Sequence, residues 1–245
     1  MSDQEQQAPA GGAEEPSPNR LVGTLAVAGL ISGVIIIAVY LATFNTIKEN
    51  KARELREAVF RVLPGVAHMQ KLLLKDGKLV VSHVEEKDEE PIYAGYDKEG
   101  NFIGYAIPSA GPGFQDTISV LYGYRPKERL VVGMWILDSR ETPGLGDKIY
   151  KDAAFVANFD RLEVDPKIVA VKKGTKSKPN EIDAITGATI SSKAVVRIIN
   201  EGNERWLSKL PEPGSEPAFE KVEEKKGEKG KEGQEHPPGA NDEGL

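Results

Sequence analysis

The chain has 245 residues, a net charge of −6 and a pI near 5.3, enough for one ordinary domain with additional segments. It contains no cysteine, which excludes disulfides, thiolate metal sites, cysteine-ligated iron–sulfur clusters and cysteine-attached haem. The histidines lack metal-ligand spacing (His68, His83, His236), and the acidic balance gives no electrostatic footprint for nucleic acid. We therefore expect no metal site and no nucleic-acid partner; any redox chemistry needs an organic cofactor.

The N-terminal part combines a polar head with a long apolar segment. Residues 1–20 are rich in proline, glycine and glutamate, which favours disorder. Residues 21–47, "LVGTLAVAGLISGVIIIAVYLATFNTI", carry no charge. As a helix they rise roughly 40 Å, more than the hydrocarbon thickness of about 30 Å. A cleaved secretory signal is the alternative, but its apolar core is shorter. We predict a transmembrane helix at 21–47, in contact with membrane lipid.

The charges that flank this helix bear on its orientation. Arg20 precedes it, whereas Lys48, Lys51, Arg53 and Arg56 follow it. The positive-inside tendency alone would place the following domain in the cytoplasm, although large domains cross membranes regardless of such charges. The charge pattern therefore leaves the orientation open.

Residues 48–210 have the pattern of one α+β domain. A helix continues from the apolar segment to Pro64–Gly65, where these two residues end it. The turn "DKEGN" at 97–101 predicts a hairpin, and further helices are expected at 151–158 and 192–209. Strands are predicted at 78–84, 92–97, 102–108, 117–124, 129–138 and 167–172. This order favours a mainly antiparallel sheet with flanking helices, and the composition of the charged residues 211–245 predicts a disordered tail.

The stretch "DAITGATISSKAVVRIIN", Asp183 to Asn200, places small residues directly before a helix expected to begin near Ser191 or Ser192. The first turn of such a helix has free N–H groups and a partial positive charge. Thr186 and Thr189 offer hydroxyl groups beside it. The pattern suits a phosphate site, but the residues alone favour the simpler alternative, a serine cap and a glycine turn with nothing bound.

Two glycine- and proline-containing loops have the character of a ligand-site rim. "ETPGLGDK", residues 141–148, follows the most apolar strand and contains the exposed-looking Leu145. "GPGFQD", residues 111–116, carries an aromatic side chain at Phe114. Proline fixes one backbone angle, and glycine allows backbone conformations that other residues rarely adopt. Loops of this kind often line binding sites. Ordinary connecting loops are the alternative.

These motifs together carry a resemblance. "DAITGAT" fits the pattern Asp-x-x-[Ser/Thr]-Gly-Ala-[Ser/Thr] at which flavin transferases attach FMN. With "ETPGLGDKI", the "GPGF" loop and one N-terminal span, residues 21–209 resemble the G subunit of the Rnf electron-transport complex. The C subunit of the sodium-pumping NADH:quinone reductase shares the same FMN-binding domain.

The resemblance implies a site. Thr189 would carry FMN through a phosphoester, and the transferase would recognise Asp183, Thr186, Gly187 and Ala188. Thr142 and Leu145 would lie against the flavin ring, with Gly113 and Phe114 in a second flavin-side loop. The predicted cofactor site is completed by the neighbours of these residues, Glu141, Pro143, Gly144, Gly146, Ile190 and Ser191. No catalytic acid or base is nominated.

The implied function is that of a membrane-anchored flavoprotein that relays electrons as one member of an ion-translocating, Rnf-type complex. Its partners would be the other membrane and redox subunits, and a flavin transferase for maturation. The resemblance places the flavin domain on the outer, periplasmic side of the bacterial inner membrane. The alternatives are the C subunit of a sodium-translocating NADH:quinone reductase, a stand-alone FMN-binding membrane protein, or an anchor whose TGAT is only a helix cap.

Overall fold

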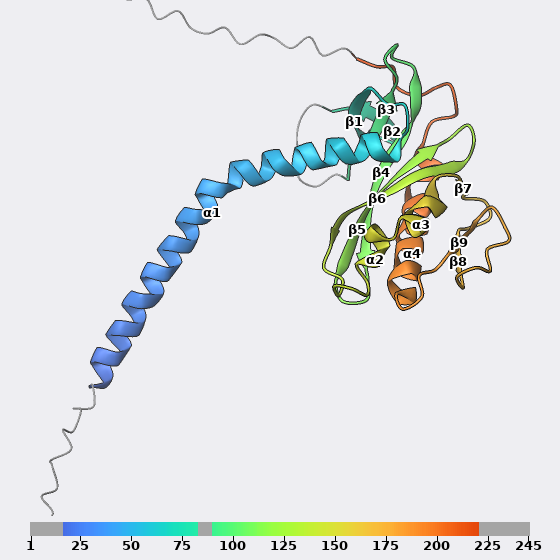
Figure 1. Ribbon diagram of the computed structural model, residues 1–245. Coiled ribbons are helices and arrows are strands. Elements are labelled where there is room, and N and C mark those ends of the chain that lie inside the picture. Colours follow the sequence, from blue (N-terminus) through green and yellow to red (C-terminus); the bar gives the residue numbers. More distant parts are fainter. Residues whose placement is uncertain (1–16, 83–89, 221–245) are drawn as a thin grey trace, which may run out of the picture.

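A long N-terminal helix leads into the folded domain. The computed structural model describes residues 17–82 and 90–220, so the head up to residue 16 and the tail from 221 lie outside the described residues. Helix α1, Pro18–Val62, has 45 residues and is bent in Figure 1. It is long and apolar enough to cross a membrane, and none of its residues 21–47 is buried. The predicted continuation of this helix into the domain is confirmed.

The core of the domain is a seven-stranded antiparallel sheet with the order β2-β1-β3-β4-β5-β6-β7. This arrangement confirms the α+β class with a mainly antiparallel sheet. The predicted hairpin turn lies between β3 and β4, where the Asp97 carboxylate accepts from the amides of Glu99 (3.0 Å) and Asn101 (2.8 Å). The strands are β1 His68–Lys75, β2 Lys78–Val81, β3 Ile92–Tyr96, β4 Phe102–Pro112, β5 Thr117–Arg125, β6 Leu130–Ser139 and β7 Leu162–Glu163.

Some elements differ from expectation. Strand β1 was not predicted, because its Leu72–Leu74 run with flanking lysines has no clear period of two. β7 and the three-residue β9, Glu181–Asp183, are too short for any pattern. The expected helix at 151–158 is broken into α2 Lys148–Lys151, α3 Ala153–Val156 and the 3₁₀ turn η1 Ala157–Phe159. Asp152 causes the break, since its carboxylate caps α3 by accepting from Ala154 N at 3.0 Å.

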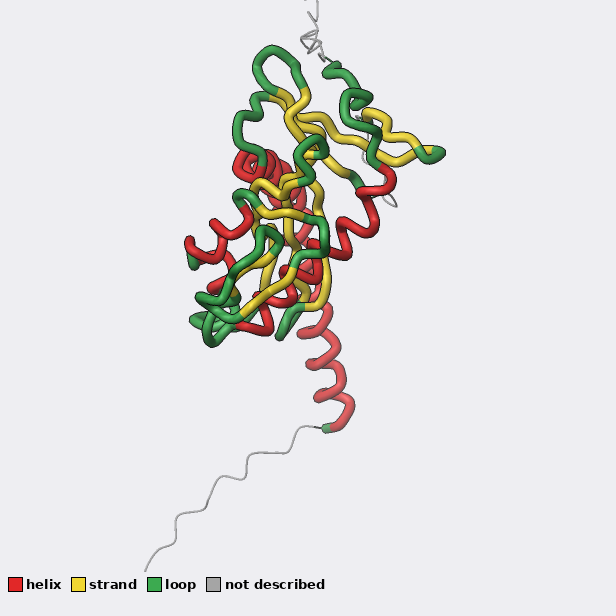
Figure 2. Tube along the Cα trace, turned by 90° about the vertical axis from the view of Figure 1, so that its right-hand side faces the viewer, coloured by secondary structure: helices red, strands yellow, loops and turns green. Residues whose placement is uncertain are grey.

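The two faces of the sheet are covered by different helices (Figures 1 and 2). The last turns of α1 bury Ala58, Val59 and Val62 against one face, together with Leu121 and Val132 of the sheet. On the other face, α4, Thr189–Trp206, covers β4 and β5, and the 3₁₀ turn η2, Leu207–Lys209, follows it. Alternate residues of each central strand therefore enter two separate cores.

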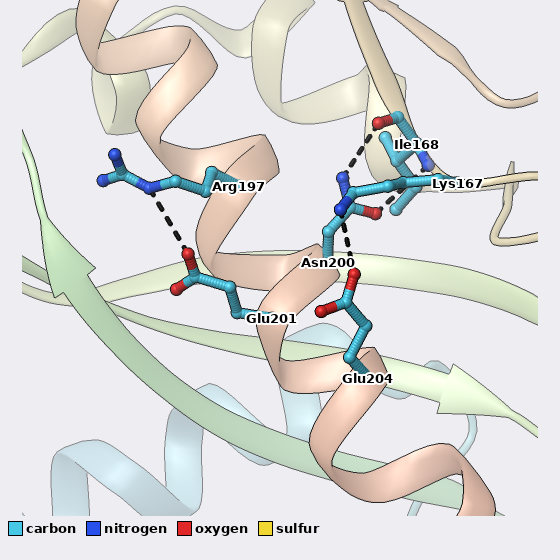
Figure 3. A network of polar contacts seen from close by, with 6 residues as sticks. All are labelled: Lys167, Ile168, Arg197, Asn200, Glu201 and Glu204. Atoms are coloured by element: carbon cyan, nitrogen blue, oxygen red, sulfur yellow. Dashed lines mark hydrogen bonds and ion pairs between the residues drawn. The ribbon is translucent and has the colours of Figure 1, made fainter.

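A small parallel unit, β8 Val169–Val171 with β9, lies beside α4 and leads into the TGAT stretch. Figure 3 shows how it is held. The buried Asn200 side chain of α4 accepts from Ile168 N at 3.1 Å and donates to Ile168 O at 2.9 Å. The exposed pair Lys167–Glu204, 2.9 Å apart, lies next to it. The residues directly before β8 are thereby fixed to α4.

The segment after α4 returns to the sheet. Residues 211–220, expected to belong to a disordered tail, instead lie against the strands. Tyr96 Oη donates to Pro217 O at 2.7 Å, and the Phe219 ring stacks on His68 with centroids 4.8 Å apart. Phe219 also packs on the edge of the main core. The cause is a long-range contact: the Phe219 ring packs beside β1 and β3, against His68 and Tyr96.

Candidate functional site

Three segments meet at the end of the domain where α4 begins, at the bottom in Figure 1. They are the β4–β5 loop, the β6–α2 loop and the TGAT turn with the first residues of α4. Between them lies an open cleft with a volume of about 350 Å³. That volume is in the range of small-molecule sites. All its lining residues belong to the site expected from the sequence: Phe114, Thr142, Leu145, Gly146, Gly187, Ala188, Thr189, Ile190 and Ser191.

The rim of the cleft is formed by three large apolar side chains, one from each segment. Phe114 is 64% exposed, Leu145 52% and Ile190 59%. An isolated apolar side chain at a surface is ordinary, but three that converge on one cleft mark a place where an apolar ligand can be covered. A flat, aromatic ligand would remove all three from water at once.

Thr189 is the first residue of α4, and its side chain is exposed at the cleft. Among the described residues its hydroxyl makes one long hydrogen bond, donating to Ile185 O at 3.4 Å. The hydroxyl oxygen is therefore reachable and weakly held. A hydroxyl in this state suits derivatisation by another enzyme.

The expected helix start near Ser191 or Ser192 is wrong, and so is the alternative in which one of these serines caps the helix. The helix begins at Thr189, and the N-cap position is Ala188, which has no side-chain oxygen. Both serines are used differently. Ser192 Oγ accepts from Ile185 N at 3.1 Å and donates to Ala188 O at 2.8 Å, which closes the TGAT turn. Ser191 points to the β6–α2 loop.

Because no side chain caps α4, its first amides are free. The N–H groups of Thr189, Ile190 and Ser191 have no acceptor in the parts of the chain that the structure describes, 17–82 and 90–220. The first backbone bond of the helix is from Ser192 N to Ala188 O at 2.9 Å. Free first-turn amides and the helix dipole both favour a negatively charged group at this end. An anion bonded to Thr189 would lie beside them.

Glu141 ties the three segments together. Its side chain is buried, with 5% of the residue exposed. Oε1 accepts from the amides of Phe114 (2.8 Å) and Gln115 (3.0 Å), and Oε2 accepts from Ser191 Oγ (2.5 Å). Burial alone would raise the pKa of the Glu141 carboxyl, but hydrogen bonds from Ser191, Gln115 and Phe114 outweigh it and lower that pKa. The carboxylate is therefore ionised at neutral pH.

Two glycines make room for this carboxylate. A Cβ on Gly113 would lie 2.4 Å from Glu141 Oε1, and a Cβ on Gly146 would lie 2.4 Å from Oε2. Neither glycine has a positive φ, so close approach and not backbone shape requires them. Gly113 and Glu141 thus pack behind the residues that line the cleft and do not line it themselves.

A second link joins the two loops. Thr142 Oγ1 donates to Gln115 Oε1 at 2.7 Å. In the β6–α2 loop the Asp147 carboxylate pairs with Lys151 Nζ at 2.6 Å, and this bond lowers the pKa of Asp147. Sequence reasoning did not include Gln115 or Asp147 in the site. The position of Gln115 directly after Phe114 in "GPGFQD" is the only signal that could have suggested it.

The remaining predicted residues lie outside the cleft. The Asp183 carboxylate accepts from Gly174 N at 2.8 Å and Lys176 N at 3.3 Å, so it orders the β8–β9 connection. Thr186 is exposed in the turn before α4, and Pro143 and Gly144 are exposed at the outer side of their loop. These residues flank the cleft and do not line it.

Comparisons with known proteins identify the family of this chain. Residues 113–204 match the FMN-binding domain family, so this match and the fold define an FMN-binding-domain protein. The chain is 34% identical over 179 residues to the G subunit of the Na⁺-translocating ferredoxin:NAD⁺ oxidoreductase complex of Acetobacterium woodii, covering 70% of this chain and 84% of that protein. It therefore belongs to the family of G subunits of Rnf-type ion-translocating oxidoreductase complexes, as the motifs indicated.

Further relatives point the same way. The G subunit of the ion-translocating oxidoreductase complex of Methanosarcina acetivorans is 29% identical over 180 residues, covering 72% of this chain and 88% of that protein. The NqrC structure from Shewanella oneidensis has a TM-score of 0.54 at 17% identity and covers 66% of this chain and 98% of that one. The C subunit of the Na⁺-translocating NADH-quinone reductase from Parabacteroides distasonis gives 0.55 at 17% identity, covering 69% and 96%. At that identity the two structures show a shared fold.

Proposed function

We propose that this protein carries FMN bound covalently through a phosphoester at Thr189, and that it relays electrons within a membrane-bound, Rnf-type ion-translocating complex. The observation that carries the proposal is the exposed, weakly held Thr189 hydroxyl in a cleft rimmed by Phe114, Leu145 and Ile190. Family membership supports the redox role.

The cleft residues fit the parts of FMN. The phosphate would be bonded to Thr189, where the free amides of the first turn of α4 favour its remaining negative charge. The apolar rim would cover the ring system, and bound flavin would supply the capacity to accept and pass on electrons. Attachment prevents dissociation, so an open cleft is sufficient. The chain's own contribution is to hold the ring and to exclude water from part of it.

Attachment is tested by a matched pair of variants. Thr189→Ser keeps a hydroxyl oxygen at the same place, whereas Thr189→Ala removes it. After co-expression with a flavin transferase and denaturing electrophoresis, we expect in-gel flavin fluorescence for wild type and Thr189→Ser and none for Thr189→Ala. Fluorescence of equal strength in Thr189→Ala would exclude this residue as the attachment point. Thr189→Ala should fold normally, because the hydrogen bond of this side chain to Ile185 O is long, at 3.4 Å.

Membrane anchoring by residues 21–47 of α1, with the flavin domain on the periplasmic side, is part of the proposal. None of the residues 21–47 is buried in the fold, so their side chains are free to contact lipid. A phosphatase fused to the C-terminus, active only outside the cytoplasm, should be active, and a cytoplasm-specific reporter at the same place should be silent. The opposite pattern would reverse the orientation. The other members of the complex should co-purify with the protein from detergent-solubilised membranes.

A further inference from the structure

The buried Glu141 carboxylate serves the cleft without lining it. It accepts three hydrogen bonds from two other segments. Gly113 and Gly146 lie so close to it that a Cβ on either would clash with the carboxylate. A buried carboxylate that served stability alone would need only hydrogen-bond donors, from any segment of the chain. This one joins both loops to the helix that begins at Thr189, so its loss would separate the walls of the cleft.

We propose that Glu141 is the positioning residue of the flavin site: its ionised carboxylate holds both loops on α4 before the cofactor arrives, and its charge makes the attached flavin harder to reduce. The inference rests on the proposed function, because it assumes FMN at Thr189. The positioning part concerns the protein without flavin as well.

The charge part follows from the surroundings of the carboxylate. Ser191 and Gly146, which contact Glu141, both line the cleft, so one buried negative charge lies directly behind its wall. Reduction adds electrons to the ring, and a nearby negative charge in a poorly solvated site opposes any negative charge that the ring gains. The bonds from Ser191, Phe114 and Gln115 reduce this effect without removing the charge. The expected result is a lower flavin potential than the same cleft would give with a neutral side chain.

The side-chain chemistry allows geometry and charge to be separated. In Glu141→Gln the amide oxygen can accept from Phe114 N and Gln115 N, and the amide nitrogen can donate to Ser191 Oγ, because a hydroxyl also accepts. This variant keeps the three links and loses the charge. Glu141→Ala loses both. Ser191→Ala keeps the charge and loses only the link to α4.

The first measurement uses the full-length protein without flavin. In wild type and Glu141→Gln, the amides of Phe114 and Gln115 should be protected from hydrogen exchange. In Glu141→Ala, these two amides should exchange at least tenfold faster. Equal protection in wild type and Glu141→Ala would overturn the positioning role. Should Glu141→Ala fail to fold, Ser191→Ala takes its place, with loss of rigidity expected at the start of α4.

The second measurement uses flavin-loaded protein, with Glu204→Gln as a control that removes an exposed acid from the same domain. The midpoint potential should become more positive in Glu141→Gln and stay at the wild-type value in Glu204→Gln. The midpoint potential of Ser191→Ala should not become more positive. An unchanged potential in Glu141→Gln would overturn the charge effect. Absence of flavin from wild type would instead contradict the proposed function, so the two failures are distinguishable.

Discussion

Ser192 Oγ accepts a hydrogen bond from the Ile185 amide at 3.1 Å and donates to Ala188 O at 2.8 Å. One fully buried hydroxyl in the first turn of α4 thus fixes both ends of the TGAT turn. The shape that presents Thr189 depends on this contact.

Ser192→Ala should therefore destabilise the fold and the turn. It leaves the buried Ile185 N–H without an acceptor, which costs roughly 1–3 kcal/mol of unfolding free energy. Urea unfolding measures the loss, and the yield of attached flavin should fall with it. Ser208→Ala, at an exposed position, should stay within about 0.5 kcal/mol of wild type. Equal stability of Ser192→Ala and wild type would contradict the role of this hydroxyl.

Gly146→Ala should displace Glu141. The new methyl group would lie 2.4 Å from Glu141 Oε2 and 2.8 Å from its Cβ, and such crowding in a packed site costs about 1–3 kcal/mol. Gly144→Ala is the matched control in the same loop: Gly144 has φ +78 and nothing within 4 Å, so it strains the backbone alone. Hydrogen exchange at the Phe114 amide distinguishes them, because only Gly146→Ala should accelerate it. The same acceleration in both variants would show that loop strain, not the clash, is responsible.

The pH dependence of stability follows from the lowered pKa of Glu141. Because its folded pKa lies below its ordinary value of 4.5, its contribution to the unfolding free energy is fully present above the unfolded pKa. The contribution is lost as the pH falls through the folded pKa. As the pH falls from about 6 to below about 4, the unfolding free energy of wild type should thus decrease more than that of Glu141→Gln. Urea unfolding across that range measures the difference.

Other carboxylates must be separated from this effect. Hydrogen bonds also lower the pKa values of Asp97, Asp147 and Glu181, so the total acid sensitivity of wild type is a sum. The ion pair Arg140–Asp116, 3.7 Å apart, lies at the same loops. The difference between wild type and Glu141→Gln isolates one residue. Parallel pH curves for the two proteins would contradict the assignment.

Residues 211–220 should contribute to the stability of the domain. Phe219 stacks on His68 and lies 5.3 Å from the Tyr96 ring, and such aromatic pairs contribute about 0.5–1.5 kcal/mol each beyond area burial. Phe219→Ala should lower the melting temperature, and truncation after Leu210 should lower it further. Truncation after Glu220 is the control and should leave it near the wild-type value. An unchanged melting temperature in Phe219→Ala would show that residues 211–220 do not stabilise the domain.

Much of the fold could be predicted because its strands are long and regular. β4, β5 and β6 have β-branched and aromatic residues between clear turn signals. β1, β7 and β9 could not, because they owe their pairing to neighbours and not to a pattern of their own. The return of Phe219 to the sheet is likewise a contact across more than 120 residues, which no local signal encodes.

The site divides in the same way. The cleft residues could be named in advance because three short motifs, "GPGF", "ETPGLGDKI" and "DAITGAT", resemble those of a known family; the residue pattern alone also fits ordinary loops and a helix cap. The role of Glu141 was not visible, because its partners lie 26, 27 and 50 positions away. The start of α4 was misplaced since the serines were interpreted as caps, whereas Ser191 and Ser192 bond to Glu141 and Ile185. Sequence shows which residues gather at a site, and packing decides which of them hold it together.

The central claim is that one hydroxyl, on Thr189, bears the redox group. Peptide mass spectrometry of the protein, isolated from cells that also make the matching flavin transferase, tests it most directly. The account predicts that the peptide containing Thr189 carries the mass of one FMN less one water, with fragment ions that place it on this residue. Recovery of that peptide entirely unmodified, or modified at Thr186 instead, would contradict it.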